Sequence, residues 1–397
     1  MNEEKKITIG LFIDVFYPMV DGVVVVVDNY ARQLSQKANV IVFAPGARDR
    51  KYKGEFPYQV IRSRYIKVPF TDYDMSIPFF DFRFRRRLKK TNLDIVHIHS
   101  PFLIGKAGIA YAKKHNVPVI ATLHSQFKKD FYERTKSQIL TNIAIKEIMR
   151  TFNQCDECYA VNHKVAEIFH EYGLSREPKV QLNATDLMPF EDLKEIDKLK
   201  KKYEIKADEK VFLYVGRLDV LKNLKFTIQA LYRLRLKHYK FKMIFVGSGP
   251  YEQEMKQQIK KSGLTDFVHF TGKINDRKVL ACHYRLAQLF LFPSLYDSSS
   301  LVQIEAASQK TPTLFLRDAA TADTITENVN GYLSEADSNL YAQKIIEIMD
   351  NTKLYNKVAK QAYKDLYVTW KDTTKQVYAN YLKLIISRLK EEQNNKE

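Results

Sequence analysis

Short apolar runs alternate along this chain with longer stretches whose apolar residues recur at helical spacing. Runs such as 39–45, 94–99 and 117–124 are bounded by turn-forming residues, as is typical of strands buried in a parallel sheet. The stretches between them place apolar residues three or four positions apart, as an amphipathic helix does. Because this alternation continues through both halves, it predicts an α/β protein with two Rossmann-like, doubly wound domains.

The same pattern divides the chain into segments. We expect an N-terminal domain over residues 1–190, a charged connector with a short helix over 191–206, and a second domain over 207–365. Apolar residues at a helical period predict further helices toward the C-terminus, and those over 366–390 are expected to pack back on the first domain. The charged residues after position 389 are expected to be disordered.

The other motifs are best understood from the stretch 289–307. An apolar run leads into a turn that carries Asp297, and three serines then cap a helix that contains Glu305. A helix start offers unpaired N–H groups and a positive dipole end, which favour a phosphate. Carboxylates repel phosphate, so Asp297 and Glu305 are better suited to ribose or sugar hydroxyls beside a diphosphate. An ordinary capped helix with an acidic turn and a solvated Glu is the alternative.

Basic residues follow a second strand end in the same half. The run 210–216 ends in glycine and leads directly to Arg217 and Lys222. Arg offers a fork of donors and Lys a mobile point charge, so the pair suits a diphosphate. Gly247 and Lys273 follow two further strands and are candidate substrate contacts, although the glycines around Gly247 do not complete a dinucleotide fingerprint.

The N-terminal half offers a second group of candidates. We predict a helix beginning near Gly22, although the valines at 23–27 have strand propensity. Gly22 would let a ligand approach the backbone closely, and a plain turn between strand and helix is the equal alternative. His124 ends a strand, where ligands of doubly wound sheets bind, and is favoured over His97, which suits a structural role.

The 397-residue chain has a formal net charge of +18, which implies an anionic partner: nucleic acid, acidic lipid or a phosphorylated ligand. Residues 79–90 interleave phenylalanines with basic residues, and on a helix Phe80 and Phe84 would share one face. The basic residues predicted to point toward the other faces include Arg83, Arg86 and Arg87. Such a helix predicts membrane contact; a core-facing helix with a solvated basic side is an equally common alternative.

No stretch of the sequence is long and apolar enough to span a membrane, and the first residues lack a signal peptide's apolar segment. We therefore expect a cytoplasmic protein, peripheral at the inner face of the cell membrane. Three cysteines are too few for a disulfide framework, and Cys155 and Cys158 are assigned a structural role in preference to metal or redox chemistry.

Together these motifs resemble those of the retaining glycosyltransferases of sequence family four, which have the GT-B architecture of two facing Rossmann-like domains. The resemblance extends from about residue 7 to residue 384. The stretch 215–223 looks like the family's Gly-Arg…Lys motif, 297–305 like its paired-carboxylate element and 118–124 like its Pro-x-x-x-Thr-x-His strand. The stretch 99–105 is similar to that of bacterial members that act on lipid acceptors, notably diacylglycerol glucosyltransferases.

The resemblance implies roles for individual residues. Arg217 and Lys222 would hold the nucleotide diphosphate, Glu305 would bind the ribose hydroxyls, and Asp297 would lie near the donor sugar. The other residues implied to lie near the donor sugar or phosphate are Gly22, His124, Ser299, Ser300 and Leu301.

The implied reaction moves a hexosyl group from a nucleotide-diphosphate sugar, UDP-glucose or similar, to a lipid or glycan acceptor of the cell envelope. It would retain the anomeric configuration and need neither a metal nor another cofactor. The acceptor and an anionic membrane surface are expected on the N-terminal domain, near residues 79–90 and near Lys128 and Lys129.

Three positions depart from the family pattern. Asp297 replaces the usual Glu, Ser300 stands where Gly is common, and 183–186 reads Asn-Ala-Thr-Asp in place of Asn-Gly-Val-Asp. The first two departures motivate an alternative, a non-catalytic paralogue that binds sugar nucleotides or glycans, or a partner subunit of an active transferase. Nucleic-acid binding is not favoured, because no nucleic-acid module is recognised and the basic residues gather beside the sugar-site motifs.

Overall fold

The computed structural model describes residues 6–19, 21–47, 52, 54–67 and 74–394, and it divides the chain into two compact units. Unit 1 comprises Met1–Asn183 and Trp370–Glu397, and unit 2 comprises Ala184–Thr369. The segment 191–206, expected as a connector between domains, therefore lies inside unit 2. Its helix α7 (Leu193–Lys202) packs against helix α10 (Arg277–Leu286) of that unit, with Ile196 buried.

Unit 1 is built on a seven-stranded parallel sheet in the order β3-β2-β1-β6-β7-β8-β9. Its strands are β1 (Thr8–Phe12), β2 (Asn39–Pro45), β3 (Gln59–Ser63), β6 (Ile95–Ile98), β7 (Val119–Leu123), β8 (Glu157–Ala160) and β9 (Lys179–Val180). A separate antiparallel pair is formed by β4 (Tyr65–Lys67) and β5 (Asp74–Ser76). Because helices cover both faces, the central strands are buried on both sides, which explains their continuous apolar runs.

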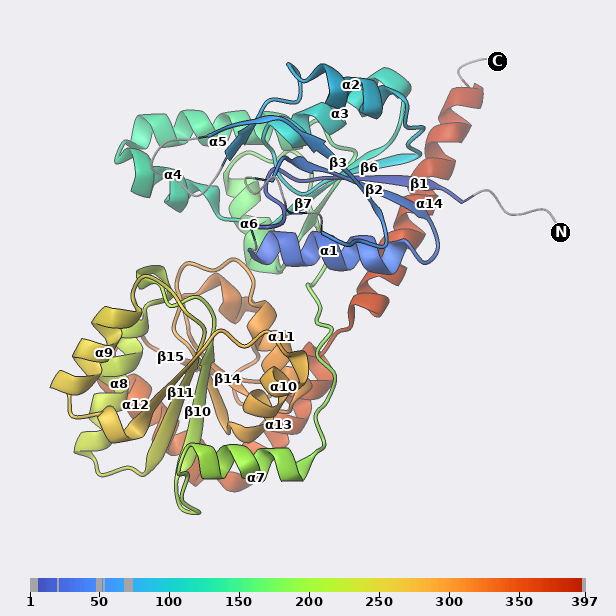
Figure 1. Ribbon diagram of the computed structural model, residues 1–397. Coiled ribbons are helices and arrows are strands. Elements are labelled where there is room, and N and C mark those ends of the chain that lie inside the picture. Colours follow the sequence, from blue (N-terminus) through green and yellow to red (C-terminus); the bar gives the residue numbers. More distant parts are fainter. Residues whose placement is uncertain (1–5, 20, 48–51, 53, 68–73, 395–397) are drawn as a thin grey trace. The chain divides into compact units, whose positions relative to one another are not determined.

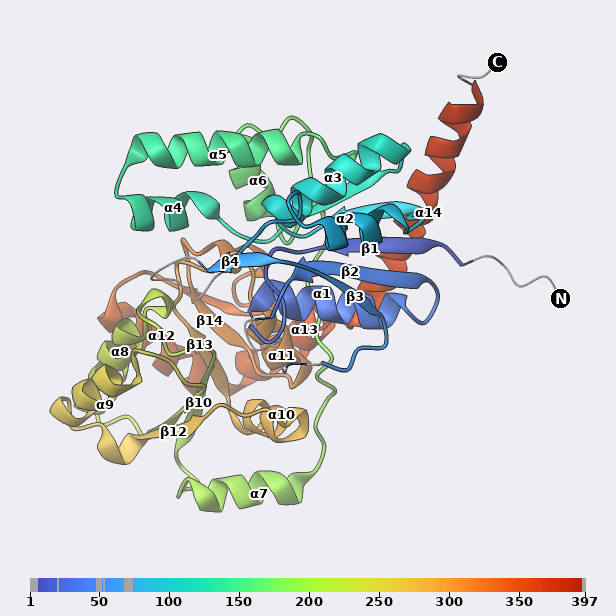
Figure 2. The same cartoon turned by 45° about the horizontal axis from the view of Figure 1, so that its top comes forward.

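The helices of unit 1 form a layer on each face of this sheet, and Figures 1 and 2 show α1 on one face and α3 and α5 on the other. The helices are α1 (Gly22–Leu34), α2 (Phe82–Lys89), α3 (Leu103–His115), α4 (Phe127–Thr135), α5 (Gln138–Phe152), α6 (His163–Glu171) and α14 (Trp370–Asn394). The predicted helix near Gly22 is confirmed despite its run of valines. Asp21 caps it by accepting from the Val24 N–H (2.8 Å), and burial of the valine side chains favours the helix over a strand.

Unit 2 contains a six-stranded parallel sheet in the order β12-β11-β10-β13-β14-β15. Its strands are β10 (Lys210–Val215), β11 (Phe241–Val246), β12 (Val268–Gly272), β13 (Leu289–Phe292), β14 (Thr313–Leu316) and β15 (Tyr332–Ser334). In addition to α7 and α10, its helices are α8 (Leu224–Leu236), α9 (Glu252–Lys261), α11 (Leu301–Ser308), α12 (Ser338–Asp350) and α13 (Thr352–Leu366). Figure 1 shows α8, α9 and α12 on one side of the strands and α10 and α11 on the other.

The last helix, α14, packs within unit 1. Tyr381 contacts His97 through a short hydrogen bond of 2.5 Å, and Trp370 lies edge-on to Tyr30 of α1. The charged residues after position 389, expected to be disordered, are helical to Asn394. Near this end Arg388 pairs with Asp156 (2.7 Å), so contacts with the body of unit 1 stabilise a stretch whose composition alone predicted disorder.

Each sheet has a point where the strand order reverses, and ligands of doubly wound sheets bind at the carboxyl ends there. In unit 1 this point lies between β1 and β6, and in unit 2 it lies between β10 and β13. The two points identify where each unit brings together residues that are distant in the sequence.

Candidate functional site

The strand-order reversal of unit 2 brings together two predicted site residues that lie 75 positions apart. Lys222 ends a short 3-10 helix (Val220–Lys222) after β10, and Asp297 follows β13, the strand beside β10. The Lys222 ammonium lies 2.5 Å from Asp297 Oδ1, and both side chains are about one-fifth exposed. The pairing of neighbouring strands thus produces an ion pair at the crevice that the sequence predicted to hold a diphosphate.

The second carboxylate oxygen of Asp297 is buried and has no hydrogen-bond partner within the described residues. An unsatisfied carboxylate oxygen is costly, by roughly 1–3 kcal/mol. A ligand hydroxyl donating to this oxygen would remove that cost, which fits the predicted position of Asp297 beside a sugar.

Arg217 is directed differently from Lys222. It follows Gly216 at the end of β10, its side chain is 60% exposed, and its Nε lies 3.6 Å from Asp219 Oδ2. Gly216 has a φ of 153°, and a Cβ there would lie 2.9 Å from the Tyr214 hydroxyl, so glycine is required for this turn. Arg217 therefore stands at the same strand end as Lys222 but remains free to reorient toward an anion.

Helix α11 begins beside Asp297, as predicted. Ser300 is its N-cap and accepts from the Gln303 N–H (3.1 Å), while Ser299 lies in the turn before it. The helix starts at Leu301, where the first N–H groups have no partner inside the helix and the dipole is positive. This geometry can receive a phosphate or a sugar oxygen, although the Ser300 hydroxyl is already used in the cap.

Glu305 lies one turn into α11 and is buried with both carboxylate oxygens in contact with protein groups. Oε1 lies 2.8 Å from the Arg277 guanidinium, and Oε2 accepts from the Tyr284 hydroxyl (2.8 Å). Arg277 also pairs with Asp186 (2.5 Å). Burial raises the pKa of Glu305, and the Arg277 charge opposes that rise. Each oxygen retains a lone pair for a ribose hydroxyl.

Sequence reasoning missed Arg277 and Tyr284. Both belong to α10, whose sequence carries no glycine turn and no motif spacing, and only the packing of α10 against α11 brings them to Glu305. Their role here is to fix the orientation of a buried carboxylate.

Gly247 and Lys273, the other predicted contacts of unit 2, follow β11 and β12. Gly247 has a φ of 134°, and a Cβ there would lie 1.9 Å from the Gly216 carbonyl oxygen. Close approach of two strand ends therefore explains this glycine without a ligand. Lys273 is exposed at the end of β12. Substrate contact at both positions stays a prediction.

A cavity of about 470 Å³ lies at the carboxyl ends of the unit 1 strands, where the strand order reverses, and its walls are predominantly aromatic and aliphatic. Phe102, Phe127 and Phe131 line it, together with Asp14 and His124. Asp14, which sequence reasoning did not select, accepts from the Ser100 hydroxyl (2.6 Å) and the Ile104 N–H (2.8 Å), so it joins the end of β1 to the start of α3. The cavity suits an apolar group with a polar end.

His124 belongs to a group of three histidines, of which His97 and His99 are buried and His124 is partly exposed. Its Nε2 lies 3.1 Å from His99 Nδ1, and His97, as predicted, is structural, between Tyr381 and Thr122. Burial lowers the pKa of His124 to about 3 and that of His99 well below its ordinary value. At neutral pH His124 is therefore an uncharged hydrogen-bonding group.

Gly22 is the first residue of α1, and its neighbours Asp21 and Val23 line the same cavity as His124. A Cβ at Gly22 would meet nothing within 4 Å. Packing within unit 1 therefore does not require glycine here, and close approach by a ligand stays the prediction.

The predicted membrane helix is partly corrected. Helix α2 begins at Phe82, capped by Asp81, so Phe84 and Leu88 point into the core of unit 1, where Phe84 is 1% exposed. The predicted membrane contact of Phe84 is therefore wrong, because packing against β2 and β3 buries the Phe84 side chain. Phe80 precedes the helix and is 87% exposed, and the basic residues Arg83, Arg86 and Arg87 are exposed. Lys128 and Lys129, also predicted near the acceptor, are exposed on α4.

None of the helices in the described ranges is long and apolar enough to cross a membrane. In the same ranges no three His, Cys, Asp or Glu side chains are grouped so as to hold a metal ion. Cys155 and Cys158 are buried free thiols, as their assigned structural role requires.

Two family models match the chain in succession. The model described as Glycosyltransferase Family 4 matches residues 20–187, and that described as Glycosyl transferases group 1 matches residues 195–365. The first match lies almost entirely in unit 1 and the second in unit 2.

Individual proteins are similar over nearly the whole length. The chain is 26% identical to the alpha-monoglucosyldiacylglycerol synthase of Streptococcus pneumoniae, covering 96% of this chain and 86% of that protein. It is 23% identical to the N-acetyl-alpha-D-glucosaminyl L-malate synthase of Bacillus anthracis, covering 98% and 100%. The crystal structure of Anabaena HepE in complex with UDP superposes with a TM-score of 0.76 at 18% identity, covering 94% and 99%. At that identity the structural likeness shows the fold.

Proposed function

The chain belongs to the glycosyltransferases described by these two family models, and on that premise we propose that it moves a hexosyl group from a nucleotide-diphosphate sugar to a membrane-associated lipid or glycan acceptor. Its two parallel-sheet units have the GT-B architecture that the sequence predicted. The proposed donor is UDP-glucose or a similar UDP-sugar, the proposed reaction retains the anomeric configuration, and the proposed setting is cell-envelope biosynthesis.

The observation that carries the proposal is the Lys222–Asp297 pair at the strand-order reversal of unit 2, beside the start of α11. In one crevice it combines a cation and helix N–H groups for a diphosphate with a carboxylate oxygen that lacks a partner within the described residues. Buried Glu305 lies one turn further along the same helix and supplies a second acceptor, for the ribose hydroxyls. These groups match a nucleotide diphosphate joined to a sugar.

In the proposed mechanism the leaving diphosphate and the incoming acceptor hydroxyl share one face of the sugar. The bond between the sugar carbon and the diphosphate oxygen breaks, the acceptor oxygen forms the new bond, and its proton passes to a diphosphate oxygen. Lys222, a reoriented Arg217 and the first N–H groups of α11 stabilise the negative charge that grows on the diphosphate. No metal or other cofactor takes part in this proposal.

We assign the acceptor to unit 1. The cavity beside His124 has aromatic walls with a few polar groups at the strand ends, which suits a hydroxyl carried on an apolar body. His124, which the family resemblance places near the donor sugar, is uncharged and hydrogen-bonded to His99, so it orients a hydroxyl of the donor sugar or of the acceptor without adding charge. The pneumococcal relative is by its name a glucosyldiacylglycerol synthase, and it supports a lipid acceptor.

The protein is further proposed to act in the cytoplasm as a peripheral protein of the cell membrane. Exposed Phe80 and the exposed basic face of α2 support this location, since apolar and cationic groups together favour an anionic lipid surface.

The test is turnover by the purified protein with a panel of nucleotide sugars, with and without anionic vesicles that contain diacylglycerol, following released nucleotide and lipid product. Lipid-dependent turnover with one UDP-sugar is the expected result. Turnover only with a soluble acceptor, such as L-malate or a glycan, would keep the transferase and overturn the lipid acceptor. Donor binding without turnover on any acceptor would replace the proposal with the non-catalytic paralogue that the Asp297 and Ser300 departures motivate.

A further inference from the structure

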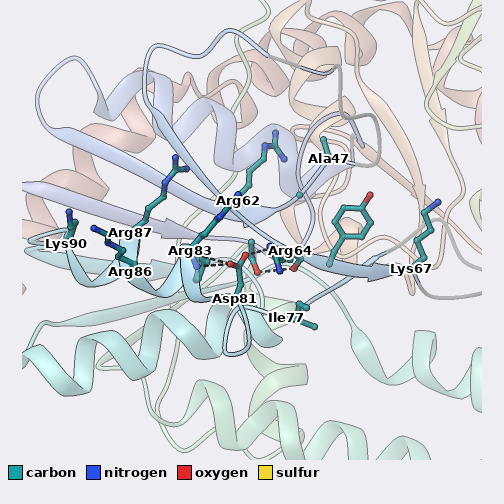
Figure 3. A pocket seen from close by; sticks show the side chains of 14 residues that line it. Ala47, Arg62, Arg64, Lys67, Ile77, Asp81, Arg83, Arg86, Arg87 and Lys90 are labelled. Atoms are coloured by element: carbon teal, nitrogen blue, oxygen red, sulfur yellow. Dashed lines mark hydrogen bonds between the residues drawn. The ribbon is translucent and has the colours of Figure 1, made fainter.

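A second hollow of unit 1, of about 1050 Å³, shares no lining residue with the His124 cavity. Its lining comes mainly from β3, β4 and α2, and Figure 3 shows basic side chains from all three elements. Seven of its described lining residues are Arg or Lys, and one, Asp81, is acidic. The proposed transfer reaction uses none of them.

One wall is provided by the strands. Arg62 of β3 is half-buried and fixed, because it donates to the Pro45 carbonyl oxygen (2.8 Å) and its guanidinium lies 5.7 Å from the Phe16 ring centroid. Arg64 follows β3, and Lys67 ends β4; both are exposed. The strand wall therefore holds one anchored cation and two exposed cations.

The other wall is provided by α2. Arg83, Arg86, Arg87 and Lys90 line the hollow, whereas Arg85 and Lys89 of the same helix do not. The helical period explains this division, since residues three or four positions apart lie on one side of a helix. The chain thus offers two sets of basic residues on one helix that differ only in whether they line the hollow.

Within the described ranges, one carboxylate, that of Asp81, lines the hollow against seven basic side chains. None of the seven basic residues forms an ion pair with a described residue. Asp81 is engaged with the main chain: one of its oxygens accepts from the Arg64 N–H (2.7 Å) and the other from the Arg83 N–H (3.0 Å). Like charges gathered in a concave surface repel one another, and a multivalent anion relieves that repulsion.

Exposed apolar side chains flank the hollow on the same elements. Ile66 of β4 pairs in register with Met75 of β5, and these side chains are 52% and 47% exposed; Met75 also lines the His124 cavity. At the start of α2, Phe80 is 87% exposed and Phe82 is 74% exposed. A soluble anion needs no such apolar rim, whereas a lipid surface contacts both apolar groups and headgroup phosphates.

We propose that this hollow is a discrete, saturable site for the phosphate headgroups of acidic membrane lipids, with the apolar rim in contact with the acyl boundary. The inference rests on the proposed lipid acceptor and deepens it: docking uses a concave site built from two elements, in place of a flat amphipathic helix. Because Arg62, Arg64 and Lys67 form one wall, headgroup binding also requires the strands that precede α2.

The experiment compares two double variants of the full chain. Arg86→Gln/Lys90→Gln removes two cations that line the hollow, and Arg85→Gln/Lys89→Gln removes the same charges from the rest of the helix. All four side chains are exposed, so both variants should fold, as thermal unfolding would verify. Binding is measured by sedimentation with vesicles of phosphatidylcholine, with and without phosphatidylglycerol, and by calorimetry with inorganic pyrophosphate.

We expect saturable binding to the phosphatidylglycerol vesicles, weakened about tenfold or more by the hollow variant relative to the control variant. Equal losses in the two variants would overturn the discrete site, because general surface charge would then explain binding. Pyrophosphate binding that the hollow variant loses and the control variant keeps, without vesicle binding, would overturn the lipid assignment, whereas pyrophosphate binding common to both variants would report the diphosphate site of unit 2. Donor binding, measured by calorimetry with UDP, should be unchanged in both variants because the donor groups belong to unit 2, and turnover of the parent protein with a detergent-dispersed acceptor is measured separately, so failure of this site and failure of the proposed transferase activity remain distinguishable.

Discussion

The two units place different chemistry at equivalent points of similar sheets. At its strand-order reversal unit 1 has a cavity with mainly apolar walls, uncharged histidines and carboxylates such as Asp14, whereas unit 2 has ion pairs, Lys222 with Asp297 and Arg277 with Glu305. The difference follows from what each is proposed to hold. A leaving diphosphate is stabilised by positioned cations, whereas an acceptor hydroxyl carried on an apolar body binds best to an apolar surface that excludes water, beside an uncharged hydrogen-bonding group.

The comparison also separates two ways of controlling charge. Burial keeps the histidines of unit 1 neutral by lowering their pKa values, while the carboxylates of unit 2 are held beside cations. The two units should therefore respond differently to loss of a cation and to a change of pH.

The largest effect is expected from Lys222→Ala. The substitution removes the cation assigned to the leaving diphosphate and leaves Asp297 without its partner. We expect kcat to fall by a hundredfold or more, about 2.7 kcal/mol in the barrier, as for removal of a comparable preorganised donor. Lys225→Ala is the matched control, because this lysine is exposed on the neighbouring α8. Full turnover by Lys222→Ala would contradict the division of roles between the units.

Acidification should destabilise unit 1. Burial lowers the pKa values of His97 and His124 to about 3, so below about pH 6.5 the unfolded chain binds protons that the folded unit excludes. Stability therefore decreases as the pH falls from 6.5 toward 3, by at most about 1.4 kcal/mol per pH unit for each histidine. Trp370, the single tryptophan, is buried in unit 1, and its fluorescence reports this unfolding.

The measurement is urea unfolding followed by Trp370 fluorescence at pH 7.5, 6 and 5. His124→Asn should show a shallower decrease than the parent protein, because it lacks one of the histidines whose pKa is lowered in the folded unit. A midpoint that stays constant between pH 7.5 and 5 would show that the histidines take up protons without unfolding.

Alternation of strands and helices allowed the two sheets to be predicted, and motif spacing placed Lys222 and Asp297 at strand ends that prove to be neighbours. Phe84 could not be assigned in this way. The sequence pattern of an amphipathic helix is the same whether its apolar face contacts a protein core or a membrane. In the structure α2 begins at Phe82, with Asp81 as its N-cap, and Phe84 then faces the core of unit 1. The C-terminal residues were wrongly predicted to be disordered for a related reason. The helix there is stabilised by contacts with residues distant in the sequence, such as the ion pair of Arg388 with Asp156.

A moderate effect is expected from Arg277→Gln. Glu305 would keep the Tyr284 hydrogen bond and lose its cation, so burial would raise the pKa of Glu305 with less opposition. We expect donor affinity to fall about tenfold, about 1.4 kcal/mol, and to recover partly as the pH rises and Glu305 ionises. Isothermal titration with UDP across pH measures this. Lys278→Gln is the control, because Lys278 is exposed on the same helix. Equal losses of donor affinity in the two variants would show that Arg277 has no specific role in donor binding.

The smallest effect concerns Ser300, which has two assigned roles. As the N-cap of α11 it accepts from the Gln303 N–H, so Ser300→Ala should destabilise unit 2 by about 1 kcal/mol and Ser300→Gly by only a few tenths. As a neighbour of the donor sugar it carries a Cβ that Ala keeps and Gly removes. A donor KM that falls only in Ser300→Gly would place the Cβ against the sugar, whereas equal KM values in the two variants would leave capping as its role.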